Sequence, residues 1–169
     1  MDKEFDGKIV KIMSCSNCNT KCNHCYISYK GSFTPEDLLE TVKNLKKKYK
    51  FNGTEPLLTP GYLESFKEAG EELVLTNGLV FKNNESYLQN VKNAEIKQVC
   101  ISYHFELHDI VSKVDKKYLE HLFPIVRSYG LDAEIMTTIS SVNYNKVLEY
   151  CEKAVKMGAN NIHFTNLGA

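Results

Sequence analysis

Residues 18 to 26 read Cys18-Asn-Thr-Lys-Cys22-Asn-His-Cys25-Tyr26 and follow closely on an apolar, strand-like segment, Ile9-Val-Lys-Ile-Met13. Three cysteines at this C-x3-C-x2-C spacing in one loop suit an iron–sulfur cluster, because cysteine sulfurs ligate such clusters. A four-iron cluster held by only three cysteines has one iron without a protein ligand. That iron can bind a substrate or cofactor, so the loop predicts reactive chemistry more than a structural cross-link.

Other kinds of cysteine site fit this spacing less well. A zinc site usually pairs two close cysteines with a second pair roughly 12–20 residues away, whereas the four cysteines from Cys15 to Cys25 share one loop. The bacterial ferredoxin run is C-x2-C-x2-C-x3-C, with its gaps in a different order. Disulfides are not expected in a chain without a secretory signal. A structural zinc site and a closed four-cysteine cluster stay open as alternatives.

Three motifs together resemble those of the radical S-adenosylmethionine (radical SAM) superfamily. The segment Cys18–Tyr26 resembles its cluster loop. Phe51-Asn-Gly-Thr-Glu-Pro-Leu-Leu58 resembles its GGEPLL segment, with threonine in place of the second glycine, and Leu75-Thr-Asn-Gly78 resembles the end of its third strand. The CxHCY ending of the loop is similar to the branch of peptide-maturing enzymes that carry C-terminal auxiliary-cluster domains.

The resemblance implies both a fold and a chemistry. The fold would be a partial (β/α)6 barrel whose site lies at the C-terminal ends of the strands. Cys18, Cys22 and Cys25 would ligate three irons of a [4Fe–4S] cluster, and the amino and carboxylate groups of S-adenosylmethionine would chelate the fourth. The reduced cluster would cleave this cofactor to a 5′-deoxyadenosyl radical that abstracts hydrogen from a peptide or small-molecule substrate. Flavodoxin or ferredoxin would donate the electron.

Further residues near the strand ends are expected, by the same resemblance, to contact S-adenosylmethionine. The segment Gly53-Thr54-Glu55 would lie against its ammonium group, since glycine permits close approach and carbonyl or carboxylate oxygens accept from a cation. His24 stands where the family packs a side chain against adenine. His104 could contact the ribose, the substrate or the core. The complete expected set is His24, Gly53, Thr54, Glu55, Thr76, Asn77, Ser102, His104, Thr138 and Asn166.

The remaining cysteines and histidines are interpreted as structural. Cys15 is a small residue at the end of the first strand, and Cys100 and Cys151 are buried core thiols, which behave as small hydrophobes. The spacing of the other histidines indicates no metal site. These histidines are His108, His121 and His163.

Composition limits the class of protein. A length of 169 residues indicates one domain, residues 1–169, with a core large enough to fold. The 21 basic and 21 acidic residues give no net charge, which argues against binding to nucleic acid or to an anionic membrane surface. The charged start is unlike a signal peptide, and no apolar stretch reaches the roughly 18 residues of a membrane span. We therefore expect a cytoplasmic protein.

Strand-like and helix-like segments alternate along the chain, which predicts βαβ units and a parallel sheet. The predicted strands are Lys8–Met13, Lys50–Asn52, Glu72–Thr76, Gln98–Tyr103, Leu131–Thr138 and Asn161–Thr165. The predicted helices begin at Pro35 behind a Thr34 cap, or span Gly61–Ala69, Glu85–Val91, Tyr118–Tyr129 with a kink or restart at Pro124, and Asn145–Met157 with Val147, Leu148, Cys151, Ala154 and Val155 on its apolar face. Because the chain stops right after the sixth strand, where a last helix is missing, we expect a truncated fragment or an excised domain.

Three functions remain in view. The leading one is the core of a radical SAM enzyme acting on a peptide. Within the family, the alternative is an activating enzyme for a glycyl-radical partner, which suits the short length. From a different class, a non-catalytic module could hold one metal in a closed site made of Cys15, Cys18, Cys22 and Cys25.

Overall fold

Every strand pairing among the described residues is parallel. A computed structural model describes residues 10–15, 17–23, 25, 34–44 and 49–166, with backbone only for residues 10–15 and 49–53. Within this part of the chain, the strand ladders form a two-stranded sheet, β1-β2, and a four-stranded sheet in the order β3-β4-β5-β6. The strands are β1 (Val10–Cys15), β2 (Tyr49–Gly53), β3 (Leu73–Thr76), β4 (Gln98–Ser102), β5 (Asp132–Ile139) and β6 (Asn161–Asn166).

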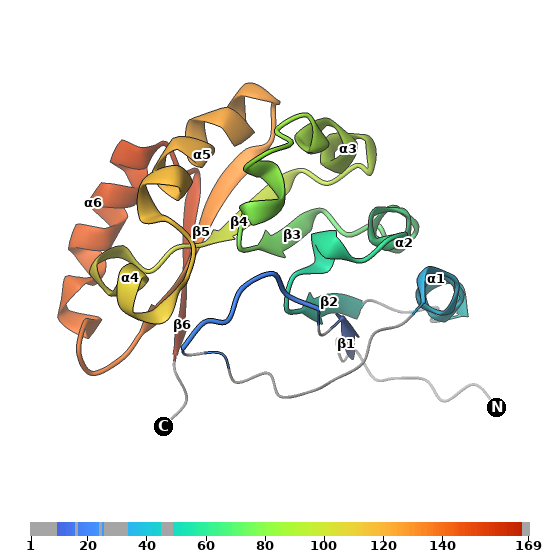
Figure 1. Cartoon of the computed structure of the whole chain (residues 1–169), viewed down its shortest axis with the longest axis horizontal. Helices are drawn as coiled ribbons and strands as arrows, with labels where there is room; N and C mark the ends of the chain where they lie inside the picture. Colours follow the sequence, from blue (N-terminus) through green and yellow to red (C-terminus); the bar gives the residue numbers. More distant parts are fainter. Residues whose placement is uncertain (1–9, 16, 24, 26–33, 45–48, 167–169) are drawn as a thin grey trace.

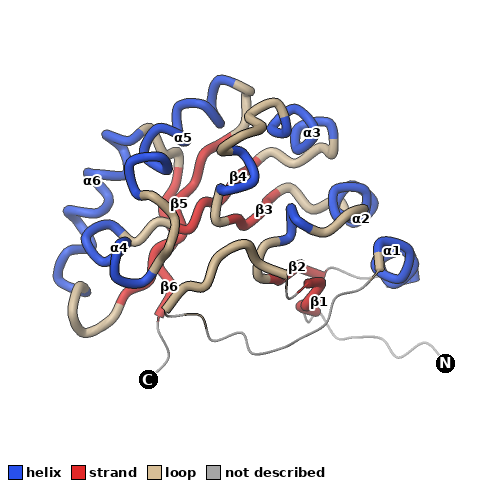
Figure 2. Tube along the Cα trace, in the orientation of Figure 1, coloured by secondary structure: helices blue, strands red, loops and turns tan. Residues whose placement is uncertain are grey.

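Helices connect consecutive strands and lie along the outer side of the arc that the strands form (Figure 1). Figure 2 shows the same arc as a tube, with the loop after β1 crossing its open side. This alternation of helices and parallel strands is the predicted fold class. The helices are α1 (Pro35–Asn44), α2 (Tyr62–Ala69), α3 (Tyr87–Asn93), α4 (His108–Val111), α5 (Lys116–Ser128) and α6 (Val147–Met157).

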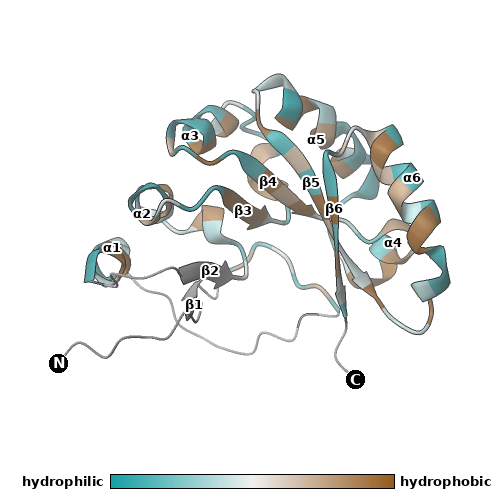
Figure 3. Ribbon diagram, turned by 180° about the vertical axis from the view of Figure 1, so that it is seen from behind, coloured by the Kyte–Doolittle hydropathy of each residue, from teal (hydrophilic) through white to brown (hydrophobic). Residues whose placement is uncertain are grey.

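The main core lies between the four-stranded sheet and its helices. Because side chains alternate along a strand, every second residue of β4 and β5 points toward the helices. Val99 and Ile135 are fully buried there, in one cluster with Leu122 and Phe123 of α5. Figure 3 shows the corresponding hydrophobic colour along β3 and β4. Burying each such side chain contributes about 1.5–3 kcal/mol to the free energy of unfolding.

One predicted helix start is confirmed, and another helix starts and continues differently from the sequence prediction. The Thr34 cap is confirmed, since its hydroxyl accepts from the Asp37 backbone N–H at 3.1 Å. Helix α5, however, begins at Lys116, capped by the Asp115 carboxylate, which accepts from the Lys117 N–H at 3.0 Å. It runs through Pro124 as one element, so a restart there was wrong. The fully buried side chains just before and after Pro124 anchor both halves against the sheet.

The apolar face predicted for α6 was wrong in part, since Ala154 is buried as predicted but other members are not. Leu148 and Val155 are 81% and 74% exposed, and Cys151 is only partly buried. The helix is instead turned so that Tyr150 is buried and stacks on the Phe105 ring, with 4.2 Å between the ring centroids. A large aromatic ring thus decides the orientation over several smaller apolar side chains. Cys100, by contrast, is fully buried as predicted.

Candidate functional site

A buried carboxylate joins the ends of β2 and β3, which belong to different sheets. Glu55 follows β2 and is fully buried. Its Oε1 accepts from the Thr76 hydroxyl at 2.8 Å, and its Oε2 accepts from the Asn77 backbone N–H at 2.7 Å. Burial raises the pKa of Glu55 to about 7, and these hydrogen bonds only partly oppose the shift. Two of the three sequence motifs are therefore locked together through one side chain.

The glycine of the third motif has a structural reason. Gly78 has a φ of 81°, in the left-handed region where a side chain is strained. A Cβ atom at this position would lie 2.9 Å from Cδ2 of Leu122 and 3.0 Å from Cδ2 of Leu119. The chain must therefore turn directly after Asn77, and this turn presents the Asn77 side chain at the strand end.

The second motif grips the start of the cysteine loop. The backbone carbonyl of Asn17 accepts from the Thr54 hydroxyl and from the Glu55 N–H, the latter at 3.1 Å. The threonine that replaces the family's glycine therefore has a partner, and its side chain fits the site. Asn77 holds the next turn of the loop, because its Nδ2 donates to Asn19 Oδ1 at 2.7 Å and to the sulfur of Cys18 at 3.7 Å.

The far end of the loop is attached to α4, a helix that the sequence did not predict. The Asn23 backbone N–H donates to the Val111 carbonyl at 2.9 Å, and the Asn23 side chain donates to the Ile110 carbonyl at 2.7 Å. The loop thus spans from the end of β2 to the connection between β4 and α5. Its three asparagines make these contacts, and their frequency in the loop was a signal that the sequence prediction did not use.

The three motif cysteines lie along this anchored loop as free thiols. Cys18 and Cys25 are exposed and Cys22 is partly buried. The sulfurs of Cys18 and Cys22 approach the same hydroxyl, that of Thr20, at 3.1 and 3.5 Å. The Cys25 N–H donates to the Cys22 carbonyl at 3.2 Å. Three accessible sulfur donors on one held loop suit the iron–sulfur cluster that the spacing predicts.

The other described residues that are expected to contact the cofactor lie at or near the ends of β2, β4, β5 and β6. His104 is buried, and its Nδ1 accepts from the Thr138 backbone N–H at 3.3 Å, so it links the ends of β4 and β5. Ser102 ends β4 and is partly buried, whereas Asn166 ends β6 and is exposed. Gly53 closes β2 beside Cys15 of β1 in the strand register. His24 and the side chain of Cys15 lie outside the described residues.

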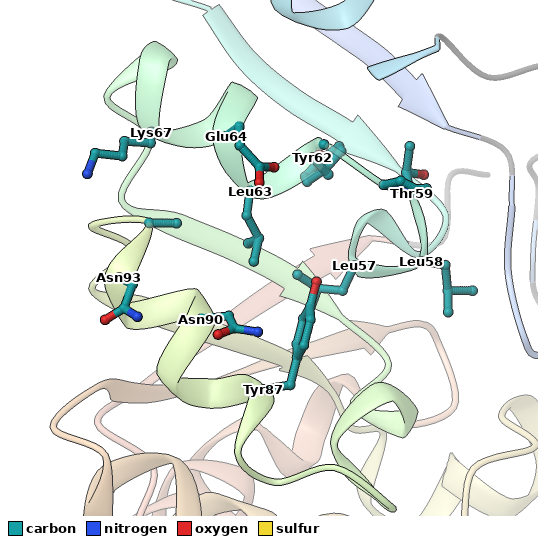
Figure 4. A pocket seen from close by; sticks show the side chains of 13 residues that line it. Leu57, Leu58, Thr59, Tyr62, Leu63, Glu64, Lys67, Tyr87, Asn90 and Asn93 are labelled. Atoms are coloured by element: carbon teal, nitrogen blue, oxygen red, sulfur yellow. The ribbon is translucent and has the colours of Figure 1, made fainter. Parts of the chain in front are cut away.

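Two pockets among the described residues have similar volumes but different positions in the fold. One of about 540 Å³ lies on the helical side, between the 3-10 helix η1 (Pro56–Leu58), α2 and α3, with Tyr62, Tyr87 and Asn90 in its lining (Figure 4). The other, of about 580 Å³, lies at the C-terminal ends of β5 and β6 and includes Tyr144 and Phe164. Only the second is at the end of the sheet that carries the expected cofactor residues.

No protein-family model and no curated protein matches this chain. Solved structures do match it. Streptococcus suis SuiB aligns over 95% of this chain and 40% of its own, with 14% identity and a TM-score of 0.74. SuiB bound to its precursor peptide SuiA gives 14% identity, a TM-score of 0.76 and coverage of 94% and 39%. Native anSMEcpe with bound AdoMet and Cp18Cys peptide gives 20% identity and a TM-score of 0.73. The alignment covers 96% of this chain and 52% of anSMEcpe.

This chain has the fold of SuiB and anSMEcpe. It spans about 40% of the length of SuiB and about half of anSMEcpe. The predicted partial barrel of parallel strands is thereby confirmed. No helix in the part of the chain that the structure describes is long and apolar enough to cross a membrane.

Proposed function

We propose that this chain is the catalytic core of a radical SAM enzyme that modifies a peptide. The observation that carries the proposal is the grip of two motifs on the cysteine loop. Asn77 donates to the sulfur of Cys18, and Thr54 and Glu55 both donate to the carbonyl of Asn17. A closed metal module would need only the loop itself, whereas here the loop is positioned by the ends of β2 and β3.

Cys18, Cys22 and Cys25 would hold the [4Fe–4S] cluster, since their thiols are free and accessible. When bound, the cluster and S-adenosylmethionine supply one-electron reduction and a carbon radical that abstracts hydrogen from the substrate. Asn77 would stabilise the thiolate of Cys18 through its N–H donor. Glu55 would fix Thr76 and Asn77 at the strand end and offer its remaining lone pairs to the N–H groups of the cofactor's amino group.

The other cofactor contacts are proposed from the family pattern. They would come from strand ends that surround the loop, which agrees with the position of catalytic residues in parallel α/β barrels. His104 is mainly a brace between β4 and β5, so its contact with the cofactor would be made from that fixed position. The proposed set is His24, Gly53, Thr54, Glu55, Thr76, Asn77, Ser102, His104, Thr138 and Asn166.

A peptide is the proposed substrate class. SuiB is solved with its precursor peptide, and anSMEcpe with the Cp18Cys peptide. In this chain, the pocket of about 580 Å³ at the ends of β5 and β6 places apolar and hydroxyl groups side by side, including Ile139, Tyr144 and Thr165. Such a mixed lining suits a peptide segment. Flavodoxin or ferredoxin would donate the electron, and a reducing cytoplasm would keep the thiols free.

The test is electron paramagnetic resonance of the anaerobically reconstituted, dithionite-reduced protein, with and without S-adenosylmethionine. We expect a four-iron signal that changes when the cofactor is added. Cys18→Ala should abolish it, whereas Cys15→Ala should leave it intact. Loss of the cluster in Cys15→Ala would favour the closed four-cysteine module, and bound zinc without iron would refute the proposal. A glycyl radical formed on a partner protein would favour the activating enzyme.

A further inference from the structure

Three side chains that no motif accounts for meet on the inner face of the four-stranded sheet. Val99, Ile101 and Ile135 point toward the helices, so the alternating residues Cys100 and Glu134 point the other way, into the concave side. Cys100 and Glu134 are direct neighbours in the register of β4 and β5. His163 comes from β6, the next strand. The donor atoms of Cys100, Glu134 and His163 all lie within 4.8 Å of one another.

This cluster contains a carboxylate buried without a permanent cation. The Glu134 side chain is 1% exposed. Its Oε1 accepts from Asn161 Nδ2 at 2.8 Å, and its Oε2 lies 2.7 Å from His163 Nε2. Among the ion pairs of the described residues, its partner is this histidine and no lysine or arginine. Burying a carboxylate is costly unless a charge compensates it, so a cation at this point would stabilise the fold.

We propose that Cys100, Glu134 and His163 form a binding site for a divalent transition metal, with zinc as the metal that their donors suit best. Sulfur, imidazole nitrogen and carboxylate oxygen are the zinc ligands of proteins, whereas calcium and magnesium prefer oxygen alone. Tetrahedral ligands about 2.0–2.3 Å from zinc stand roughly 3.3–3.7 Å apart. The 2.7 Å contact between His163 and Glu134 joins a nitrogen and an oxygen, so it has to open by about 0.6 Å, which a partly exposed histidine on β6 allows.

The surroundings supply what a metal ligand needs beyond the donor atoms. The Asn161 amide holds the second oxygen of Glu134, which fixes the carboxylate as outer partners do in metal sites. The His163 side chain is 44% exposed, so one side of the cluster opens to solvent. Three protein ligands would leave the fourth position on that side for water or a substrate group. The described contacts of Cys100 and Glu134 are separate from those of the cysteine loop.

The position within the sheet separates this site from the cluster loop. Cys100 lies two residues before Ser102, which ends β4, so this ligand lies about 7 Å below the end of β4. Sequence spacing could not indicate this site, because its residues come from three strands. The prediction that His163 takes part in no metal site rested on that spacing alone.

Cobalt(II) titration tests the proposal, because a thiolate bound to Co²⁺ gives a charge-transfer band. The full chain is used with Cys15, Cys18, Cys22 and Cys25 replaced by alanine, so that the loop cannot bind the probe. We expect one equivalent of Co²⁺, four-coordinate visible bands, a thiolate-to-cobalt band and displacement by Zn²⁺. In this background Cys100→Ser should remove the thiolate band, whereas Cys151→Ala, which changes the partly buried thiol of α6, should leave it.

A second variant keeps the test decisive if the buried positions do not tolerate change. His163→Ala alters a partly exposed side chain and should weaken Co²⁺ binding at least tenfold, while circular dichroism stays that of the parent protein. If the folded chain without the four loop cysteines shows no thiolate-to-cobalt band, the proposal is overturned. Glu134 would then be a buried carboxylate whose partners are the His163 ring and the Asn161 amide. Because the loop cysteines are absent throughout, neither result depends on the radical chemistry.

Discussion

Replacing Glu55 by glutamine should make the protein more stable at alkaline pH than at acid pH, relative to the parent. Glu55 is fully buried, and burial raises its pKa to about 7 from an ordinary value of 4.5. Below pH 4.5 the carboxyl is protonated in both the folded and the unfolded state. Between pH 4.5 and 7 the unfolded chain loses this proton while the folded chain keeps it, so the free energy of unfolding falls as the pH rises.

The magnitude follows from the two pKa values. Each unit of difference corresponds to about 1.4 kcal/mol, so from pH 4.5 to above 7 the parent loses about 3 kcal/mol through this one group. Glutamine does not ionise and resembles the protonated carboxyl in shape. The free energy of unfolding of Glu55→Gln, minus that of the parent, should therefore rise by about 3 kcal/mol between pH 5 and pH 8.

Urea unfolding at both pH values, on protein without cluster or cofactor, measures this difference. Glu68→Gln, at an exposed position of α2, is the matched control and should leave the pH dependence of stability as in the parent. An equal difference between Glu55→Gln and the parent at pH 5 and pH 8 would refute the reasoning. It would mean that hydrogen bonds from Thr76 and Asn77 outweigh the cost of burying the charge.

Four further outcomes are expected. Because the N–H groups of the cofactor's amino group donate more strongly to the ionised carboxyl of Glu55 than to the protonated one, the affinity for S-adenosylmethionine should rise from pH 6 to pH 8 in calorimetry, and Glu55→Gln should flatten that rise. Thr54→Val removes one of the two donors to the Asn17 carbonyl and should cost about 0.5–1.5 kcal/mol in urea unfolding, with Thr54→Ser close to the parent. Asn77→Asp replaces an N–H donor near the Cys18 sulfur by a negative charge and should lower the cluster's reduction potential in redox titration. Gly78→Ala combines a left-handed φ with a Cβ only 2.9 Å from Leu122, and should cost roughly 1–3 kcal/mol in thermal unfolding.

Each of these has an outcome that contradicts it. Affinity for the cofactor that does not vary with pH would place its ammonium group away from Glu55. Thr54→Ser behaving like Thr54→Val would show that the hydroxyl contributes nothing to the loop. An unchanged potential in Asn77→Asp would mean that the amide does not act on the sulfur, and a neutral Gly78→Ala would mean that α5 yields without cost.

The strands could be predicted well because their signals are local. An apolar, β-branched run between turn residues is enough to indicate β4, and the Thr34-Pro35 start is enough to fix α1. The four residues of α4 are too few to show any helical period, so this element could not be found in the same way. The face of α6 was mistaken because periodicity counts apolar residues equally, whereas the stacking of Tyr150 on Phe105 depends on a partner far away in the sequence.

For the candidate site too, only the features with a local sequence signal could be predicted. Motif spacing identified the three cysteines and the two strand ends, since those residues are close together in the chain or follow strands. It could not show that Glu55 points at Thr76 and Asn77, because which groups a carboxylate meets depends on how two sheets pack. The proposed metal site could not be predicted from the sequence at all. Only the parallel register of three strands brings together its residues Cys100, Glu134 and His163.

The cysteine loop depends on the rest of the chain for its shape. In the described part of the loop, residues 17–23 and 25 form no helix or strand, so their backbone groups need partners elsewhere. Those partners are Thr54 and Glu55 after β2, Asn77 after β3 and the carbonyls of α4. Three elements that are distant in sequence thus set the positions of three sulfurs. If the loop holds the proposed cluster, any change that loosens the packing of β3 or α4 should affect the cluster before it affects the global fold, and the loss of iron should precede the loss of circular dichroism on heating.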